Sequence, residues 1–255
     1  MPFAAQFVGT FLRGVPNGKG HLRFANGDDY TGTFRDGAMD GDGRYRFRAT
    51  GDVYEGGWQA GRPHGCGAYV WARGRSRYCG SVESGAVGVG GRGCHTNRAH
   101  EVYTGEFAGG AYHGWGALVS STRGHYRGQW RAGQMEGACV WAMPGGSEFR
   151  GTVQQGRFEG RGTFLRGEDQ SRFTGEFKLG SPWRGRLCSA DGTRTEGQFA
   201  DWLAEGRATV TLRDGQVFAC SSWKGGKKNG PGSWTHPARR ESFTGGFEND
   251  MMQGE

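Results

Sequence analysis

One short motif returns along nearly the whole chain: an aromatic residue, any residue, glycine, any residue and a second aromatic residue. Clear copies begin at Phe7, Tyr30, Tyr54, Tyr103, Tyr126, Phe173 and Phe243, and weaker copies begin at Tyr78, Phe149, Thr195 and Phe218. Successive copies start 22 to 25 residues apart. A fixed period of this length is the signature of a repeat architecture, in which each unit buries its apolar face against its neighbours. The chain is therefore predicted to be a single array of about ten to eleven repeats.

Later positions of each repeat recur as well. Counted from the first aromatic residue, glycine returns at the seventh, eleventh and thirteenth positions, as Gly37, Gly41 and Gly43 show. Apolar residues follow at the fifteenth and seventeenth, such as Tyr45 and Phe47. Because strand side chains alternate between faces, the first aromatic residues and the later glycines predict two strands that share one face. The seventh-position glycine predicts the turn between them, and polar residues occupy the opposite face.

Composition favours the same interpretation. Glycine makes up 52 of 255 residues, against roughly 7% in ordinary proteins, and it is poor in helix interiors. A lone hairpin is only marginally stable in water. Glycines without a Cβ leave a trough in which we expect an aromatic ring of the neighbouring hairpin to lie. The predicted fold is all-β: an extended single antiparallel sheet of tandem β-hairpins, forming a twisted open rod.

The third copy carries the strongest family resemblance. From Tyr54 to Gly67 it reads Tyr-Glu-Gly-Gly-Trp-Gln-Ala-Gly-Arg-Pro-His-Gly-Cys-Gly. It resembles the MORN (membrane occupation and recognition nexus) repeat, Tyr-x-Gly-x-Trp-x-x-Gly-x-x-x-Gly-x-Gly, at every position, and the resemblance runs from Phe7 to the terminus. The resemblance implies one long antiparallel sheet with an aromatic-lined groove. It also implies scaffold roles in cytoskeletal, flagellar and membrane-junction assemblies, and accessory modules on some enzymes.

Several repeats depart from the pattern. The fourth carries an irregular insert at about 85–102, and the eighth has Arg184 and Arg186 where glycines are expected. The ninth has Trp202 in place of the turn glycine. Kinks or bulges are expected at these places. The last repeat stops at Glu255 in mid-hairpin, so we expect either that the array continues in the natural protein or that another subunit completes the open edge.

No constellation for catalysis or cofactor binding stands out. The six cysteines form no CxxC pair and are interpreted as reduced thiols. The segment Gly88–Gly93 matches GxGxxG without a βαβ context, and Asp40–Gly43 lacks the later ligands of a calcium loop. Cys94, His95 and His100 lack a fourth metal ligand. We therefore expect no enzyme activity, no cofactor and no metal. Nucleic acid is not an expected partner, because the aromatic residues follow the structural period.

The sequence also bears on location. No stretch approaches the ~18 apolar residues of a membrane span, and the N-terminus lacks the organisation of a signal peptide. We expect a cytoplasmic protein associated with the cytoskeleton or with a cilium or flagellum. Peripheral membrane attachment is the alternative.

The predicted function is that of a scaffold whose aromatic and glycine groove binds a helical or extended segment of a partner protein. The proposed groove residues are Tyr30, Phe34, Tyr54, Trp58, Trp71, Tyr103, Phe107, Tyr126, Trp130 and Trp141. Three further tryptophans fall outside the aromatic register and are candidates for exposed contacts: Trp115, Trp183 and Trp202. Self-association through the terminal repeats is a further expectation, since unpaired strand edges favour pairing.

Two alternatives remain open at the level of sequence. The formal net charge is +7, which suits anionic lipid or acidic partners. The candidate basic patch comprises Arg73, Arg75, Arg77, Lys224, Lys227, Lys228, Arg239 and Arg240. The second alternative is that the array is the regulatory arm of a larger enzyme.

Overall fold

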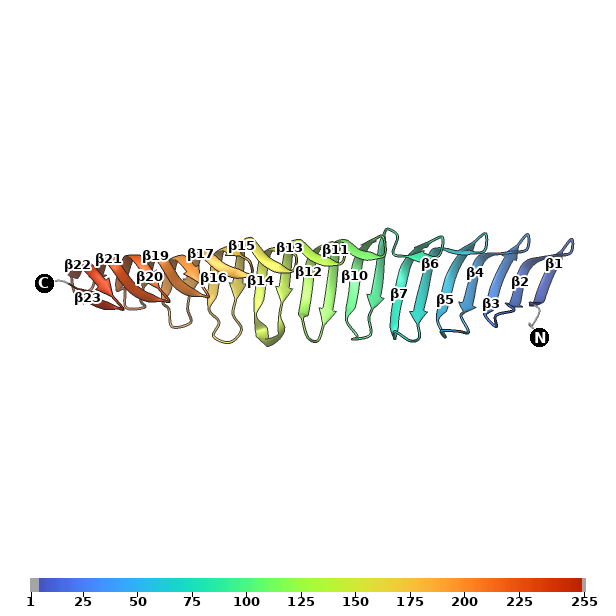
Figure 1. Ribbon diagram of the computed structural model, residues 1–255, viewed down its shortest axis with the longest axis horizontal. Helices are drawn as coiled ribbons and strands as arrows, with labels where there is room; N and C mark the ends of the chain where they lie inside the picture. The colour runs from blue at the N-terminus through green and yellow to red at the C-terminus, as the bar shows by residue number, and fades with distance from the viewer. Residues whose placement is uncertain (1–4, 254–255) are drawn as a thin grey trace. The chain divides into compact units, whose positions relative to one another are not determined.

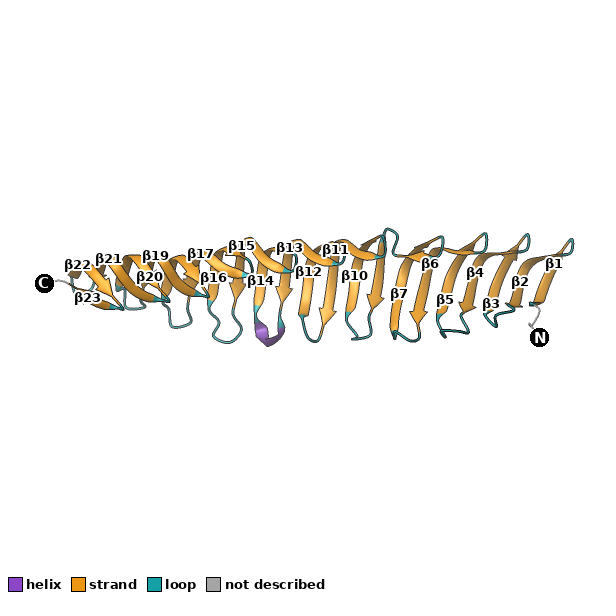
Figure 2. Ribbon diagram, in the orientation of Figure 1, coloured by secondary structure: helices purple, strands orange, loops and turns teal. Residues whose placement is uncertain are grey.

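A computed structural model describes residues 5–253, and this part of the chain is β throughout except for one 3-10 helix, Pro144–Gly146 (Figure 2). The described residues contain 23 strands: β1 (Gln6–Leu12), β2 (Val15–Arg23), β3 (Asp29–Arg35), β4 (Ala38–Arg46), β5 (Val53–Gln59), β6 (Arg62–Trp71), β7 (Ser76–Glu83), β8 (Ala86–Val87), β9 (Arg92–Thr96), β10 (Val102–Ala108), β11 (Ala111–Ser120), β12 (Gly124–Arg131), β13 (Gln134–Ala142), β14 (Glu148–Gln154), β15 (Arg157–Leu165), β16 (Arg172–Lys178), β17 (Ser181–Cys188), β18 (Arg194–Ala200), β19 (Leu203–Thr211), β20 (Val217–Lys224), β21 (Lys227–His236), β22 (Glu241–Glu248) and β23 (Met251–Gln253).

Within each of the two units described below, consecutive strands pair antiparallel in an open sheet, as the ribbon shows (Figure 1). β9 completes the fourth hairpin by pairing with β7 as well as with β10. The prediction of an all-β open antiparallel sheet of tandem hairpins is confirmed. The chain divides into two units, here called the N-terminal and C-terminal halves. The first runs to Ser121 and includes Gln129–Gln134, and the second comprises Thr122–Gly128 and the chain from Met135.

Two-residue turns with positive φ at both positions close the hairpins. In the third repeat Ala60 has φ of 47° and Gly61 has φ of 81°, as in a type I′ turn, whose twist matches that of the flanking strands. The N–H of Gly61 also donates to the carbonyl of Met39 at 2.9 Å. Each such bond ties a turn to the preceding hairpin. Within each half the tight turns lie along one edge of the sheet and the longer loops along the other (Figure 1).

A row of glycines crosses the strands and explains why the repeat needs them. Gly32 faces Gly43, and Gly43 faces Gly56 of the next hairpin. The ring of Tyr30 lies over this row, and a Cβ added to Gly43 would overlap it. The Tyr30 hydroxyl donates to the backbone oxygen of Thr33 at 3.0 Å. The sequence-based expectation was partly wrong here: the ring over the glycines comes from the same hairpin, because the first aromatic residue lies directly beside its own glycine pair.

The neighbouring hairpin contributes the next ring. Trp58 packs edge-on against Tyr30 with ring centroids 5.0 Å apart, and its Nε1–H donates to the Gly43 carbonyl at 3.2 Å. Trp130 repeats the arrangement against Tyr103, with ring centroids 5.3 Å apart. Aromatic pairs of this geometry add about 0.5–1.5 kcal/mol beyond the area that they bury. Each repeat is therefore stabilised mainly by the next one along the array.

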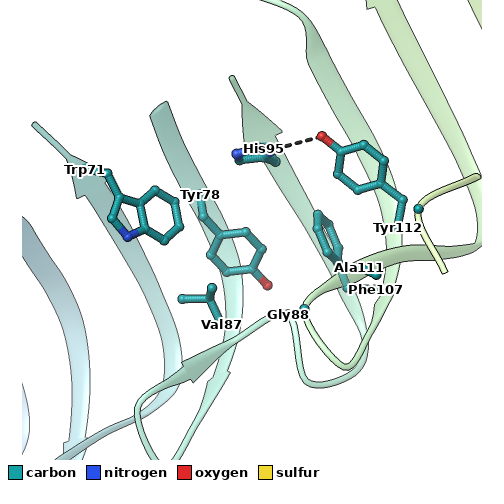
Figure 3. A pocket seen from close by; sticks show the side chains of 10 residues that line it. Trp71, Tyr78, Val87, Gly88, His95, Phe107, Ala111 and Tyr112 are labelled. Carbon is teal, nitrogen blue, oxygen red and sulfur yellow. Dashed lines mark hydrogen bonds between the residues drawn. The ribbon is translucent and has the colours of Figure 1, made fainter. Parts of the chain in front are cut away.

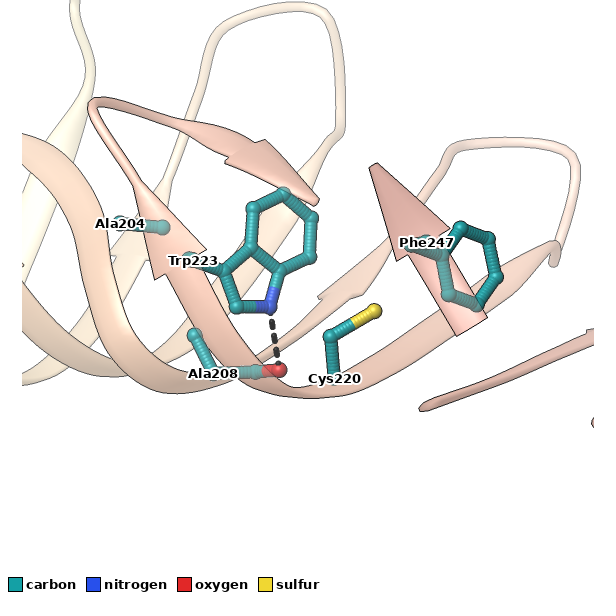
Figure 4. Close-up of a cluster of buried hydrophobic side chains, with 5 residues drawn as sticks. All are labelled: Ala204, Ala208, Cys220, Trp223 and Phe247. Carbon is teal, nitrogen blue, oxygen red and sulfur yellow. Dashed lines mark hydrogen bonds between the residues drawn. The ribbon is translucent and has the colours of Figure 1, made fainter. Parts of the chain in front are cut away.

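The C-terminal half has larger residues in the glycine row. Ala208 and Cys220 face one another there and belong to a buried cluster with Ala204, Trp223 and Phe247 (Figure 4). Trp223 donates from Nε1 to the Ala208 carbonyl at 2.8 Å. The ninth repeat begins with Thr195 instead of an aromatic residue, so no ring of its own has to lie over position 208, and a methyl group fits.

Candidate functional site

The structure buries most of the predicted groove residues. Eight of the ten have at most 6% of their surface exposed: Tyr30, Phe34, Tyr54, Trp58, Tyr103, Phe107, Tyr126 and Trp130. They fill the space between hairpins and act as packing residues, because the second aromatic ring of one repeat packs on the first aromatic ring of the repeat before it. Burial also raises the pKa of Tyr30, Tyr54 and Tyr103 to about 12, so these phenols stay protonated at neutral pH. Contact between a partner and these residues stays a prediction.

The two remaining groove residues, Trp71 and Trp141, are half-buried. Trp141 donates from Nε1 to the Arg123 carbonyl at 2.7 Å, which holds its ring against the loop edge of the C-terminal half. Trp71 ends β6 and packs on Tyr69 with ring centroids 4.7 Å apart. Of these two, Trp71 lines an apolar pocket.

That pocket originates in the irregular fourth repeat. The row glycine Gly93 lies eight positions after the turn glycine Gly85. In the third repeat the corresponding glycines, Gly61 and Gly67, are only six positions apart. The two additional residues break the second strand into β8 and β9, with residues 88–91 between them. Gly93 still faces Gly80, so the register recovers at once. The predicted disturbance at 85–102 is therefore concentrated in the few residues between β8 and β9.

Residues 88–91 are held in place by backbone hydrogen bonds. The N–H of Phe107 donates to the Gly91 carbonyl at 2.9 Å, and the N–H of Gly110 donates to the Gly88 carbonyl at 2.9 Å. Gly88 has φ of 63°, and a Cβ there would lie 2.9 Å from Cδ1 of Phe107. Glycine at this position thus permits close contact with the Phe107 ring.

The resulting hollow, here called the fourth-repeat pocket, has a volume of about 270 Å³. Figure 3 shows its aromatic walls and the histidine at its rim. It is lined by Trp71, Tyr78, Val87, Gly88, His95, Phe107, Gly110, Ala111, Tyr112 and Gly133. His95 occupies the place held by Tyr69 one repeat earlier, and Val82, which pairs with the lining residue Val87, replaces the second aromatic residue of the motif. All of these residues belong to the N-terminal half.

His95 supplies the polar group at the pocket. Its Nδ1 shares a hydrogen bond of 2.7 Å with the hydroxyl of Tyr112, and its ring lies edge-on to Trp71 at 6.3 Å. Within residues 5–253, Nε2 of His95 has no hydrogen-bond partner. Burial lowers the pKa of His95 below its ordinary value, because the charged ring is poorly solvated there. The imidazole is therefore neutral at pH 7 and keeps one nitrogen for a ligand.

The out-of-register tryptophans separate into two kinds. Trp115 is 50% exposed and Trp183 is 44% exposed, both on bulged strands. Trp202 departs from the prediction of an exposed contact. Its ring packs against Phe164 with centroids 5.0 Å apart, and the Arg166 guanidinium lies 4.8 Å from it. The turn at position 202 directs this ring back over β15 and also over β16, where the ring centroid of Phe173 lies 6.1 Å away.

The predicted basic patch is divided. Arg73 and Arg75 share the exposed loop before β7, and Arg73 donates to the Ala49 carbonyl at 2.9 Å. Arg77 is exposed on β7 itself. The C-terminal members do not form one cluster, because Lys227 begins β21 and Arg239 follows its end; ten residues of strand span roughly 30 Å. Lys224 lies at the turn end of this hairpin, and Arg240 at its loop end.

Lys228 is also unavailable to an external partner. Its ammonium group forms an ion pair with Asp250 at 2.7 Å, and only 17% of its side chain is exposed. It lies 4.6 Å from the ring centroid of Phe218. This lysine therefore packs within the hairpin stack rather than extending from a basic surface.

Within the described part of the chain, no group of three or more His, Cys, Asp or Glu side chains is placed to hold a metal ion. The six cysteines are free thiols. None of the helices in residues 5–253 is long and apolar enough to cross a membrane. The arrangement of side chains suits binding through shape and apolar contact.

Fold and side-chain arrangement together define a repeat protein built from stacked β-hairpins. The MORN repeat matches residues 7–29, 30–49, 54–74, 103–121, 126–148, 149–167 and 220–237. The chain belongs to the MORN repeat family.

Similar proteins include Alsin from human and from rat, each 29% identical over 253 residues. The alignments cover 93% of this chain but only 14% of the length of Alsin. Among solved structures, a zebrafish TCP10 domain of CPAP in complex with a STIL peptide is similar with a TM-score of 0.45 and 13% identity, covering 84% of this chain and 93% of that chain. The Drosophila SAS-4 TCP domain with a proline-rich motif of Ana2 has a TM-score of 0.27 and 10% identity, over 78% and 81% of the two chains.

Sequence reasoning missed most of the pocket residues, although a signal for them existed. Tyr78, Val87 and Tyr112 did not stand out, because each looks like an ordinary repeat position. The signal was the pair of additional residues before Gly93, because Val87 and Gly88 in that longer stretch line the pocket.

Proposed function

We propose that this protein is a non-catalytic scaffold that binds a segment of a partner protein on its aromatic face, with one apolar side chain of that segment in the fourth-repeat pocket. The observation that carries the proposal is the pocket itself. Its walls are the rings of Trp71, Tyr78 and Phe107, and its rim holds the uncommitted Nε2 of His95. Apolar walls with a few convergent polar groups are typical of binding pockets.

The pocket's size favours a side chain over a small-molecule cofactor. Sites for drug-sized ligands run from about 300 to 1,000 Å³, and this pocket is smaller, at about 270 Å³. Buried aromatic anchors often dominate the affinity of protein interfaces. Exposed arginines in the loop after Trp71, Arg73 and Arg75, favour acidic residues beside the anchor. As part of the same proposal, the family resemblance supports a place in a cytoskeletal or ciliary assembly.

Selection of peptides from a random library tests this proposal. Peptides selected on the intact chain are expected to carry an aromatic or long aliphatic residue and to lose at least tenfold in affinity for Val87→Trp, which fills the pocket. Val70→Trp is the matched control, because Val70 is 40% exposed on the preceding hairpin outside the pocket lining. Peptides that bind both variants as tightly as the wild-type chain would refute the pocket as the anchor site, and a library that yields no binder would refute the scaffold function.

A second candidate is attachment to anionic membranes through Arg73, Arg75 and Arg77. Their exposure in and beside one loop favours it. Liposome flotation distinguishes the two, since lipid binding requires acidic lipid and weakens with salt. The role of a regulatory arm within a larger enzyme is a third candidate, supported by the small share of Alsin that this chain spans.

A further inference from the structure

A second hollow lies on the polar face of the C-terminal half, over strands β14 to β17. Its volume is about 630 Å³. It is lined by Arg150, Arg161, Gly162, Thr163, Thr174, Gly175, Glu176 and Arg184. Three arginines and one glutamate leave a surplus of two positive charges in the lining. This hollow goes beyond the proposed function, because the fourth-repeat pocket is on the aromatic face of the other half.

Two features of the repeat bring the arginines together. On β15 the register with β14 shifts just before Gly162, so Gly160 and Arg161 lie in a bulge beside the row glycine. In the eighth repeat the row glycine Gly185 lies five positions after the turn glycine Gly180. The corresponding spacing in the third repeat is six positions. Arg184 thereby pairs directly with Glu176, which faces Arg161 on its other side.

The arginines differ in whether they have an acidic partner. Arg150 forms an ion pair with Glu148. Outside the hollow, Arg186 pairs with Glu196 at 2.5 Å, and Arg44 lies 3.9 Å from Glu55. Over residues 5–253, neither Arg161 nor Arg184 forms an ion pair or a hydrogen bond through its side chain. Their guanidinium groups face the hollow with their donors uncommitted.

Two hydroxyl groups lie in the next cross-strand row of this face, beside the row Arg161–Glu176–Arg184. Thr163 and Thr174 face each other across β15 and β16, with their Oγ1 atoms 3.4 Å apart. An arginine guanidinium can donate two parallel hydrogen bonds to one carboxylate or phosphate. A threonine hydroxyl can donate one further hydrogen bond to the same anion.

We propose that this hollow binds an oxyanion, a carboxylate or a phosphate, presented by a segment of a partner protein. Arg161 and Arg184 hold the anion from the two sides of Glu176, and the hydroxyls of Thr163 and Thr174 donate to it from the adjacent cross-strand row. Glu176 neutralises part of the charge when the site is empty and weakens binding when it is filled. A membrane surface fits less well, because Glu148, Glu176 and Glu196 are interleaved with the arginines on this face and long-range attraction is screened within ~8 Å at physiological salt.

Titration of the intact chain with three short peptides tests the site. The peptides carry phosphoserine, glutamate or serine at one position within an otherwise identical Gly-Ser sequence, at 0.15 M salt. Binding is followed by the Nε–Hε signals of arginine in NMR spectra. The phosphoserine or glutamate peptide is expected to shift the signals of Arg161 and Arg184, and the serine peptide is not; which anionic peptide binds more tightly identifies the source of the oxyanion.

Variants make the assignment specific. Arg161→Gln and Arg184→Gln are each expected to lower the affinity about tenfold, and Arg161→Lys to lower it as well, because the fork geometry is lost. Glu176→Gln is expected to raise the affinity several-fold, which a purely structural role would not produce. Arg77→Gln, an exposed arginine on the N-terminal half, is the control. Equal binding of all three peptides, or no binding of peptide together with binding to phosphatidylserine vesicles, would overturn the proposal.

Discussion

The ring of Tyr54 lies across Gly67, where an added Cβ would stand 2.6 Å from two carbon atoms of that ring. The two residues are on paired strands of one hairpin, and the Tyr54 hydroxyl donates back to the Gly57 carbonyl at 2.9 Å. The ring is fixed at both ends and is fully buried. Glycine at position 67 therefore fulfils a steric requirement of the ring beside it.

This contact predicts the effect of the smallest possible substitution. Gly67→Ala should lower the free energy of unfolding by about 1–3 kcal/mol, the usual range for overpacking, because the methyl group displaces a ring that cannot move. Urea denaturation followed by circular dichroism measures the loss. Gly90→Ala is the control, since no atom lies within 4 Å of a Cβ there and its backbone is not left-handed. Equal effects of the two substitutions would contradict the steric account.

Much of this fold was predictable from the sequence because each structural role has its own residue type. The spacing of Tyr30, Gly32 and Phe34 indicates a strand with one aromatic face, and Gly37 indicates its turn. Which ring lies over which glycine was not predictable, since period alone does not distinguish the same hairpin from its neighbour. The shift of register between Gly32 and Phe34 is also invisible in the spacing.

The candidate sites were less predictable. The repeat pattern alone does not distinguish buried aromatic residues from those that line a pocket. Trp58 is buried, whereas Trp71 is half-buried and lines the fourth-repeat pocket. The difference arises one repeat later, where the longer stretch before Gly93 places Val87 and Gly88 in the lining of the pocket. Likewise, the sequence period places Arg184 at a position where glycine is expected. In the structure the shorter bulge pairs Arg184 with Glu176 instead. Both sites form where a repeat differs in length from its neighbours.

The hairpin turns offer a stabilising substitution. Ala60 has φ of 47°, a conformation that asparagine adopts at lower cost than alanine. Ala60→Asn should therefore raise the free energy of unfolding by roughly 0.5 kcal/mol or more, measured by thermal or urea denaturation. Ala108→Asn, at an exposed position at the end of β10, should give no gain. A gain at both positions would show that the left-handed backbone is not the cause.

His95 predicts a dependence of stability on pH. Burial lowers its pKa in the folded chain below the ordinary value of 6.5, so the unfolded chain binds a proton more readily. Its contribution to stability is complete above pH 6.5 and is lost as the pH falls from there through the lower folded pKa. Melting temperatures between pH 7.5 and 5 should fall more steeply for the wild-type chain than for His95→Asn. A His95→Asn slope equal to that of the wild type would contradict the assignment.

The cysteines predict a pattern of chemical reactivity. Burial raises the pKa of Cys139 from 9.0 to about 11, which lowers its thiolate fraction about a hundredfold at neutral pH, and the thiolate is the reactive form. Cys66 and Cys79 are exposed on the polar face. Iodoacetamide at pH 8 should therefore label these two long before Cys139, as measured by mass spectrometry of the digested chain. Labelling in urea is the control, because all sites should then react alike. Fast labelling of Cys139 in the native chain would mean that its hairpin opens locally, and would contradict the burial of this side chain.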